Sequence, residues 1–502
     1  MTRRTAISVM TTPLLARGSR KAFDRDFGSA LDAAAAIRAG DISSVELTTH
    51  VFGRIERFDA KVNAFVYQMR DEALAKARRI DAAVARKENL PPFAGVPIVV
   101  KEAFGVAGRP CTWGIPGLKN AIPATNADAV QRLLDSGAVL IGATNVPVEL
   151  KDEQTYNDIY GTTNNPWDLT RTPGGSSGGT SAALAAGMGF LGLGTDAGGS
   201  IRGPAHCCGI FGHKPTLDIV SLRGCSPGGA RSEAGFSGLI SVAGPMARST
   251  ADLETAMRVL GGSTPPDSVA YSWKLPAPRH TRLRDFRVGY ILEDPMTPVS
   301  SEIKPAIESA VLAVEKAGAQ VQRGWPADFS LQESFSHYFI LLNALGFSLA
   351  SPQRQAQEKA NFAAGKDDMR AAGALIDFAS WQSHNLRRLA LRALWQRYFE
   401  HIDVFLMPVL PVAAFPHDHS EQASRVLSTP EGPLPYLQAT LSYPSVANLT
   451  GCPATAAPVG KTSTGLPVGI QILGPYLEDA TPIQFAGLLA EETGGFSPPT
   501  GY

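Results

Sequence analysis

Three residues in separate stretches of the chain have the chemistry of a nucleophile and a base: Lys101, Ser176 and Ser200. Each serine lies in a glycine-rich turn, and Lys101 directly follows the apolar run from Val96 to Val100. Burial at the end of such a run disfavours the ammonium form, and full burial lowers a lysine pKa by up to roughly 3–5 units. A decrease of about 3 units, worth about 4 kcal/mol, is enough for a lysine to act as a base near neutral pH. The sequence therefore predicts a serine nucleophile served by a neutral lysine.

The two serines belong to one continuous unit. It begins with a Gly/Ser turn at 174–179, which leads into a small-residue helix at 180–186. A buried strand at 190–194 and a second glycine turn at 196–200 follow. A helix of about ten residues rises roughly 15 Å, and five or six strand residues return about 17–20 Å. Ser200 is therefore expected beside Ser176, between two turns whose free N–H groups form the kind of nest that binds an oxyanion.

Other active-site patterns fit this unit less well. A Ser-His-Asp triad needs a histidine near the serine, and no histidine lies at an obvious spacing. Residues 174–178 match G-x-S-x-G, the nucleophile elbow of α/β-hydrolases, but that motif directly follows a strand. Residues 164–173 are instead polar and contain two prolines, which argues against an esterase of that class. The glycines also do not form the G-x-x-x-x-G-K-[ST] pattern of a phosphate-binding loop.

The residues around all three positions resemble the amidase signature family, which are serine hydrolases of amide bonds. The resemblance rests on Lys101 in PIVVKEAF, Ser176 in PGGSSGGTSAA and Ser200 in GTDAGGSIRGPA. Further segments resemble the family in the same order along the chain: AVLIGATN at 138–145, NNPW at 164–167, GPMARS at 244–249 and GLPVGIQ at 465–471. The resemblance extends from about Ser29 to Glu492.

The resemblance implies a role for each residue of the site. Neutral Lys101 would take a proton through Ser176, which resembles the family's cis-peptide serine. Ser176 would deprotonate Ser200 and later protonate the leaving nitrogen, while Ser200 forms an acyl-enzyme that water hydrolyses. The N–H groups expected to hold the oxyanion are those of Ala197, Gly198, Gly199 and Ser200. The supporting residues are Ser177 as a helix cap, and Asp196 with Arg202 as a pair that fixes the second turn. No metal and no cofactor is expected.

Substrate contacts are expected from two polar or glycine-rich segments near the catalytic motifs. Residues 104–120 form a loop whose Trp113 and Ile115 can face the substrate, although a packed surface loop explains them equally well. Residues 149–160 are irregular and can form a pocket rim, with Glu149 and Tyr156 as candidate contacts.

Histidine and cysteine are not expected to take part in the chemistry. His206 and His213 depart from the residues usual in the family, and satisfied structural roles are favoured over pocket contacts. His417-Asp418-His419 has no obvious third metal ligand and is interpreted as a solvated loop. The five cysteines are too scattered for a disulfide framework and favour a reducing, cytoplasmic compartment.

The composition is that of a globular protein without a polyanionic partner. The chain has 502 residues with 46 Lys+Arg and 46 Asp+Glu, so its formal net charge is zero. This balance removes the electrostatic argument for nucleic-acid binding. No run of 18 apolar residues occurs, so no membrane-spanning helix is expected. A homodimer is compatible with these features.

The order of strands and helices favours an α/β fold, namely a large mixed, mostly parallel β-sheet covered by helices on both faces. Residues 1–27 are expected to form a flexible leader, in which Thr2-Arg3-Arg4 faintly resembles a twin-arginine export signal. Residues 28–502 are expected to form a single domain. A variable helical insert is expected at about 325–400, with helices over 331–349 and 369–398 and the polar stretch 353–368 between them.

These features predict a hydrolase that cleaves the C–N bond of a carboxylic amide through an acyl-enzyme on Ser200. The aromatic and leucine-rich insert favours a hydrophobic or aryl amide, and the same machinery can cleave a carbamate or an ester. The alternative is a glutaminase-type amidase component of a tRNA-dependent amidotransferase. Glutaminase activity and co-purification with partner subunits would distinguish the two.

Overall fold

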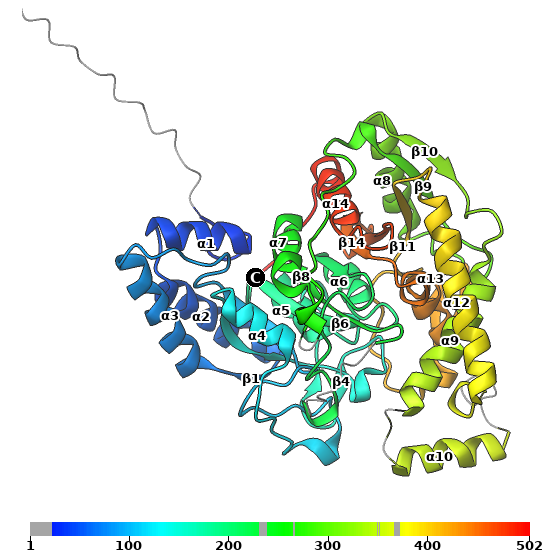
Figure 1. The fold of residues 1–502 in the computed structure, drawn as a ribbon, viewed down its shortest axis with the longest axis horizontal. Helices are drawn as coiled ribbons and strands as arrows, with labels where there is room; N and C mark the ends of the chain where they lie inside the picture. The colour runs from blue at the N-terminus through cyan, green and yellow to red at the C-terminus, as the bar shows by residue number, and fades with distance from the viewer. Residues whose placement is uncertain (1–22, 230–237, 265–266, 349, 351, 366–371) are drawn as a thin grey trace, which may run out of the picture.

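A large β-sheet runs through the protein (Figure 1). The structure is a computed structural model that describes residues 23–229, 238–264, 267–348, 350, 352–365 and 372–502. Within these residues the main sheet has 11 strands in the order β1-β3-β2-β6-β8-β7-β14-β15-β11-β9-β10. These strands are β1 Phe65–Gln68, β2 Pro97–Lys101, β3 Val139–Thr144, β6 Leu191–Asp196, β7 Phe211–Lys214, β8 Val242–Ala247, β9 Arg287–Tyr290, β10 Gln320–Arg323, β11 Val404–Pro408, β14 Ala454–Lys461 and β15 Pro467–Leu473. Two short hairpins lie outside it: β4 Tyr156–Asn157 with β5 Gly161–Thr162, and β12 Val426–Thr429 with β13 Gly432–Pro435.

The sheet is mixed, as predicted, with four parallel strand pairs on two flanks and six antiparallel pairs among the described strands, so parallel pairs are the minority. On one flank β2 pairs in parallel with β3 and β6, and on the other β9 pairs in parallel with β10 and β11. The strands described between these flanks, from β6 across to β11, pair antiparallel. The connection from β14 to β15 is short, and a short connection between neighbouring strands requires antiparallel pairing.

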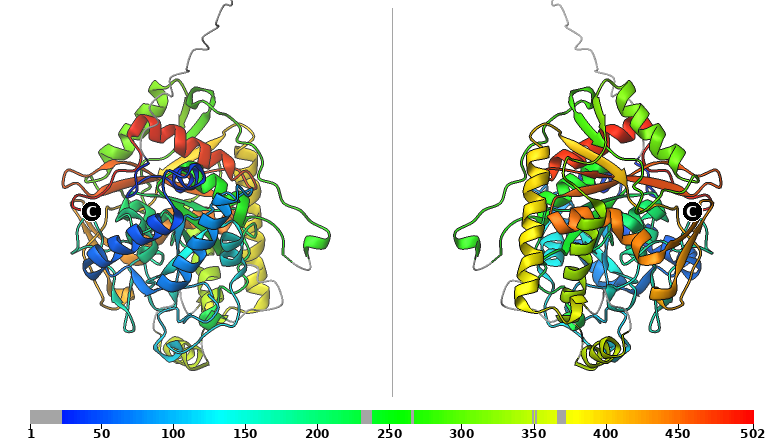
Figure 2. Two further views of the ribbon diagram at one scale, coloured as in Figure 1. Left: turned by 90° about the vertical axis from the view of Figure 1, so that its left-hand side faces the viewer. Right: turned by 90° about the vertical axis from the view of Figure 1, so that its right-hand side faces the viewer.

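Helices cover both faces of the sheet, as predicted. Helices α5 and α6 pack together on one face, and α7, α8 and α14 pack on the other (Figures 1 and 2). The described helices are α1 Ala30–Ala39, α2 Ser44–Val62, α3 Arg70–Ala85, α4 Asp128–Asp135, α5 Gly178–Ala185, α6 Arg202–Cys208, α7 Thr250–Leu260, α8 Lys304–Lys316, α9 Leu331–Ser348, α10 Pro352–Ala363, α12 Phe378–Tyr398, α13 Tyr436–Thr450 and α14 Ala480–Thr493. No helix in the described ranges is both long enough and apolar enough to cross a membrane.

Helix α5 approaches strand β6 unusually closely because two strand residues have no side chain. A Cβ built on Gly192 would lie 2.4 Å from Thr180 Cγ2, and one on Gly194 would lie 2.9 Å from Ser177 Oγ. Any larger residue at either position would push the helix away from the strand. The two glycines therefore hold the start of α5 against the end of β6, where the two catalytic turns meet.

The folded domain includes residues that the sequence assigned to the leader. The Phe23 ring stacks on Phe190 with centroids 5.9 Å apart, and Asp26 pairs with Arg54 at 2.7 Å. The boundary of the domain therefore lies no later than Phe23 rather than at residue 28. Residues 1–22, which include the Thr2-Arg3-Arg4 segment that resembles an export signal, lie outside the described residues.

The predicted insert is helical, with boundaries that differ from the prediction. Helices α9 and α12 run side by side along one edge of the molecule and pack against α13 (Figure 2). The stretch interpreted only as polar contains α10, which has no buried residue and so lacks the apolar stripe that would have marked it. Helix α12 starts at Phe378, where the Asp377 side chain caps it by accepting from the Ser380 N–H at 2.7 Å. Within the predicted stretch 369–398, residues 375–377 separate it from the helical residues 372–374.

Candidate active site

Lys101 is the last residue of β2, and its amine meets the first serine turn. Its Nζ donates to Ser176 Oγ at 2.7 Å and to Thr195 Oγ1 at 2.7 Å. The side chain is completely buried, and this burial lowers the pKa of Lys101 from 10.5 to about 7. Near neutral pH a large fraction of the amine is therefore uncharged and has a lone pair that can accept a proton.

Ser176 lies in a turn packed tightly between two other segments. The Gly175–Ser176 peptide bond is cis. A Cβ on Gly174 would lie 2.7 Å from Pro204 Cα, and one on Gly175 would lie 2.3 Å from the Asp152 carbonyl oxygen. Only glycine fits at these two positions, because any side chain would collide with backbone. The turn is thereby fixed against both 152–154 and the start of α6.

The second turn, which contains Ser200, is bound directly to the first. The Ser177 N–H donates to the Ser200 carbonyl at 3.1 Å. Ser200 itself keeps 6 % of its surface exposed, whereas Lys101 has none. The structure therefore brings the three predicted catalytic residues into one cluster, with the nucleophile candidate on its accessible side.

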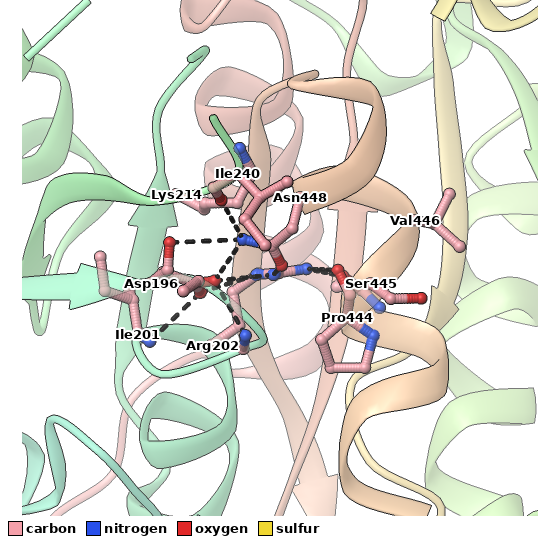
Figure 3. Close-up of polar contacts among 12 residues, drawn as sticks. Asp196, Ile201, Arg202, Lys214, Ile240, Pro444, Ser445, Val446 and Asn448 are labelled. Carbon is pink, nitrogen blue, oxygen red and sulfur yellow. Dashed lines mark hydrogen bonds and ion pairs between the residues drawn. The ribbon is translucent and has the colours of Figure 1, made fainter. Parts of the chain in front are cut away.

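A buried ion pair fixes the second turn, as predicted for Asp196 and Arg202. Arg202 Nε and Nη2 each donate to the Asp196 carboxylate at 3.0 Å, and both side chains are fully buried. Burial alone would raise the pKa of Asp196, but the Arg202 guanidinium outweighs it and holds this pKa below its usual value. Asn448 completes the cluster, since it accepts from Arg202 and donates to Asp196 (Figure 3). Both charges are thus paired and hydrogen-bonded, as buried charges require.

One of the four predicted oxyanion amides is already occupied. The Gly199 N–H donates to Asp196 Oδ1 at 2.8 Å, so this amide shapes the turn instead of facing a substrate oxygen. Across the described residues, no acceptor is recorded for the amides of Ala197, Gly198 or Ser200. A Cβ on Gly198 would lie 2.2 Å from the Tyr338 hydroxyl oxygen, so a glycine is required there.

Ser177 occupies the N-cap position of α5, as predicted, but its side chain makes no capping hydrogen bond. Its hydroxyl donates to the Thr195 carbonyl at 3.3 Å and accepts from the Thr195 N–H at 3.4 Å. The side chain bonds the strand because the two glycines of β6 bring it within reach. Ser177 therefore supports the site by joining α5 to β6.

A second buried lysine lies near the ion pair, but it contacts neither serine turn in the described contacts. Lys214 Nζ donates to the Pro215 carbonyl at 2.8 Å, and burial lowers the pKa of Lys214 to about 7. Burial and a lowered pKa are therefore common to both lysines and do not show which of them is the candidate base. The hydrogen bond to Ser176 distinguishes Lys101 from Lys214.

The two predicted rim segments contact one another. The Glu149 N–H donates to the Trp113 carbonyl at 2.8 Å, while the Trp113 indole donates to the Ala103 carbonyl at 3.0 Å. Ile115 is half-buried in the same loop. The Tyr156 hydroxyl accepts from Arg425 at 2.7 Å and its ring stacks on His419, so this side chain already has partners.

The histidines flanking the signature have structural partners, as predicted. His206 bonds the backbone of Gly469 and Val412, and His213 bonds Thr455 and Asp479. The described residues contain no cluster of three or more His, Cys, Asp or Glu that could hold a metal ion. The five cysteines are free thiols.

Sequence reasoning missed several residues of the site. Thr195 accepts from Lys101, Asn448 and Tyr338 contact the second turn, and Glu153 lies behind the first. Thr195 alone had a local signal, since it directly precedes the Asp196 turn. Glu153 belongs to the segment 149–160 that was predicted as a rim, but no pattern distinguished it there. Asn448 and Tyr338 come from segments far away in the sequence, so only the folded chain brings them to the site.

Comparison with known proteins agrees with the geometry. The model of the amidase family ("Amidase") matches residues 46–482. The chain is 34% identical over 490 residues to a glutamyl-tRNA(Gln) amidotransferase subunit from Acidothermus cellulolyticus, covering 90% of this chain and 91% of that protein. The corresponding protein of Streptomyces avermitilis is 32% identical over 483 residues, covering 90% and 92%.

Solved structures share the fold over nearly the whole chain. The crystal structure of a bacterial aryl acylamidase of the amidase signature family superposes with a TM-score of 0.76 at 25% identity, covering 93% of this chain and 96% of that chain. The family model matches most of the sequence, and these relatives match it over about nine-tenths of the chain. The chain belongs to the amidase family.

Proposed function

We propose that the protein hydrolyses a carboxylic amide through an acyl-enzyme on Ser200. The observation that supports this most directly is the 2.7 Å hydrogen bond between Lys101 Nζ and Ser176 Oγ, with Ser200 bound to the residue next to Ser176. In this proposal neutral Lys101 takes the Ser176 proton while Ser176 takes the proton of Ser200. The Ser200 oxygen then attacks the amide carbonyl carbon.

The same relay run backwards completes the reaction. Ser176 donates its proton to the leaving nitrogen, the C–N bond breaks, and the acyl group stays on Ser200 as an ester. Water then attacks this ester, with the relay removing the water proton, and releases the acid. The amides of Ala197, Gly198 and Ser200 would hold the oxyanion in both steps, while the Gly199 amide keeps the turn in shape.

We propose a hydrophobic or aryl amide as the substrate class. The aromatic residues of α9 support this choice. The Tyr338 hydroxyl reaches the second turn, and Phe335 and Phe339 pack beside Tyr338. The likeness to an aryl acylamidase structure supports it as well. A carbamate or an ester offers the same carbonyl group to Ser200, so both should be tested as substrates alongside the amides.

A second candidate is the glutaminase-type component of a tRNA-dependent amidotransferase. The sequence relatives favour it more directly than the first, because two glutamyl-tRNA(Gln) amidotransferase subunits match at 34% and 32% identity over nearly their full length. In that function the released ammonia would pass to a partner instead of to solvent.

One assay separates the two candidates. Purified protein is offered anilides, aliphatic amides, carbamates, esters and glutamine, and the Ser200 peptide is examined by mass spectrometry for an acyl adduct. We expect turnover of anilides or aliphatic amides, an adduct on Ser200, and loss of both in Ser200→Ala with an unchanged circular dichroism spectrum. Turnover confined to glutamine, with co-purifying partner subunits, would support the second candidate. An active Ser200→Ala variant would refute the nucleophile assignment.

A further inference from the structure

A buried acid lies directly behind the Ser176 turn. A Cβ on Gly175 would lie 2.7 Å from the Gln154 backbone nitrogen and 2.7 Å from the Glu153 carbonyl carbon. The segment 152–154 is therefore in backbone contact with the residue that precedes Ser176. Glu153 is the middle residue of this segment, and its side chain has no role in the proposed mechanism.

The Glu153 side chain reaches the helical turn that follows Ser200. A Cβ on Gly203 would lie 3.2 Å from Glu153 Oε2. The Gly203 N–H donates to the Gly199 carbonyl, so this turn is already helical, and residues three apart in a helical turn are neighbours on its surface. The carboxyl group therefore lies between the Ser176 turn and the surface that Ser200 shares with Gly203.

Glu153 and the nucleophile candidate have the same small access to solvent. Each keeps 6 % of its surface exposed, whereas Lys101 and Arg202 keep none. Neither residue is completely sealed from solvent, unlike Lys101 and Arg202.

The Glu153 carboxyl lacks the partners that neighbouring acids have. Its Oε2 is buried and has no hydrogen-bond partner in the described part of the chain. The adjacent Asp152 carboxylate accepts from Arg425 at 2.7 Å and from the Tyr436 hydroxyl at 2.6 Å. An unsatisfied buried polar group is rare in folded proteins and calls for an explanation, and a bound ligand is one.

The environment of Glu153 favours its neutral form. Burial raises the pKa of Glu153 well above its ordinary value, and the Asp196 and Asp152 carboxylates raise it further against the opposing effect of Lys101 and Arg202. A protonated carboxyl group has an O–H that can donate to an oxygen acceptor. A cationic group would gain less here, because Asp196 and Asp152 are already paired with Arg202 and Arg425.

We propose that Glu153 is a specificity-determining residue whose carboxyl group donates a hydrogen bond to a neutral oxygen acceptor, such as a ketone, on the amide substrate beside the scissile bond. The proposal rests on the proposed function and narrows its substrate class. The protein would thus prefer an amide with one polar oxygen within an otherwise apolar chain.

The test compares hexanoyl anilide with oxohexanoyl anilides, in which one methylene is replaced by a ketone at successive positions. Wild type is expected to show at least about tenfold higher kcat/KM for one ketone than for the apolar parent, which corresponds to about 1.4 kcal/mol. Glu153→Gln keeps a donor of the same shape and should retain most of this preference. Glu153→Met should abolish it, so that the ratio of the kcat/KM values for the ketone and the parent falls to about one, whatever happens to the absolute rates.

Asp252→Asn provides the matched control, because Asp252 is also a buried acid but accepts only from the amides of Ala30 and Leu31 in the described contacts. It should change stability without changing the ketone preference. An aminohexanoyl anilide tests the cationic alternative, and a preference for it would overturn the proposal, as would equal ketone preference in wild type and Glu153→Met. If wild type hydrolyses no anilide, or Ser200→Ala remains active, the proposed function fails and the inference fails with it.

Discussion

The neutral state of Lys101 can be tested by placing a charge beside it. Thr195 Oγ1 lies 2.7 Å from Lys101 Nζ, and Thr195 is only 8 % exposed. Thr195→Asp would put a carboxylate at this position, and an opposite charge within about 4–6 Å raises a lysine pKa by roughly 1–3 units. The substitution should therefore restore the ammonium form that burial suppresses.

The magnitude follows from the pKa of about 7 for Lys101. At pH 7 such a lysine is about half neutral, whereas an increase of about 2 units leaves about 1 % neutral, so activity should fall roughly 50-fold. Lys101 must be deprotonated to act as a base, so activity rises as pH increases through its pKa. The acidic limb of the pH profile should therefore move from near pH 7 in wild type to near pH 9 in Thr195→Asp.

The assay is kcat/KM for an accepted amide from pH 5 to 10, because its limbs report the pKa values of the free enzyme. Thr195→Asn is the matched control, since it has nearly the same shape as the aspartate without its charge. We expect it to keep the acidic limb near pH 7. If both variants lose activity equally with the limb unmoved, Lys101 is not the base that this reasoning assigns.

Two further substitutions test how the fold holds the site. Gly192→Ala should lower the free energy of unfolding by about 1–3 kcal/mol in urea titrations, because its Cβ would lie 2.4 Å from Thr180 Cγ2. Adding Thr180→Ser removes that methyl group but keeps a hydroxyl for Thr144, so the double variant should recover much of the loss; no recovery would contradict the contact. Arg202→Met should cost about 3–5 kcal/mol because it leaves Asp196 buried without its ion-pair partner. The control Arg86→Met breaks an exposed pair with Glu88 and should cost at most about 1 kcal/mol; equal losses would argue against the buried pair.

The local parts of the site were predictable because their signals are local. The glycine turns, the strand before Lys101 and the helix between the serines are continuous in sequence, and their lengths alone bring Ser176 near Ser200. Helix α10 was missed because none of its residues is buried, so no hydrophobic pattern marks it.

The remaining parts of the site depend on contacts that no spacing encodes. The Gly199 amide was assigned to the oxyanion, but only the folded turn shows that Asp196 occupies it. Ser177 has the sequence of a cap, yet the close approach of α5 to β6 gives its hydroxyl a nearer partner. Glu153 and Gly203 are 50 positions apart, and their proximity depends on the packing of the 152–154 segment against the start of α6.

The Tyr338 hydroxyl donates to the Ala197 carbonyl at 2.9 Å, so a helix of the insert is bonded to the turn proposed to stabilise the transition state. Engineers who exchange this insert to accept new substrates would also alter the rigidity of that turn. Selectivity and turnover are therefore coupled traits in this enzyme, and a chimaera that omits Tyr338 should be slow even toward compounds that it binds well.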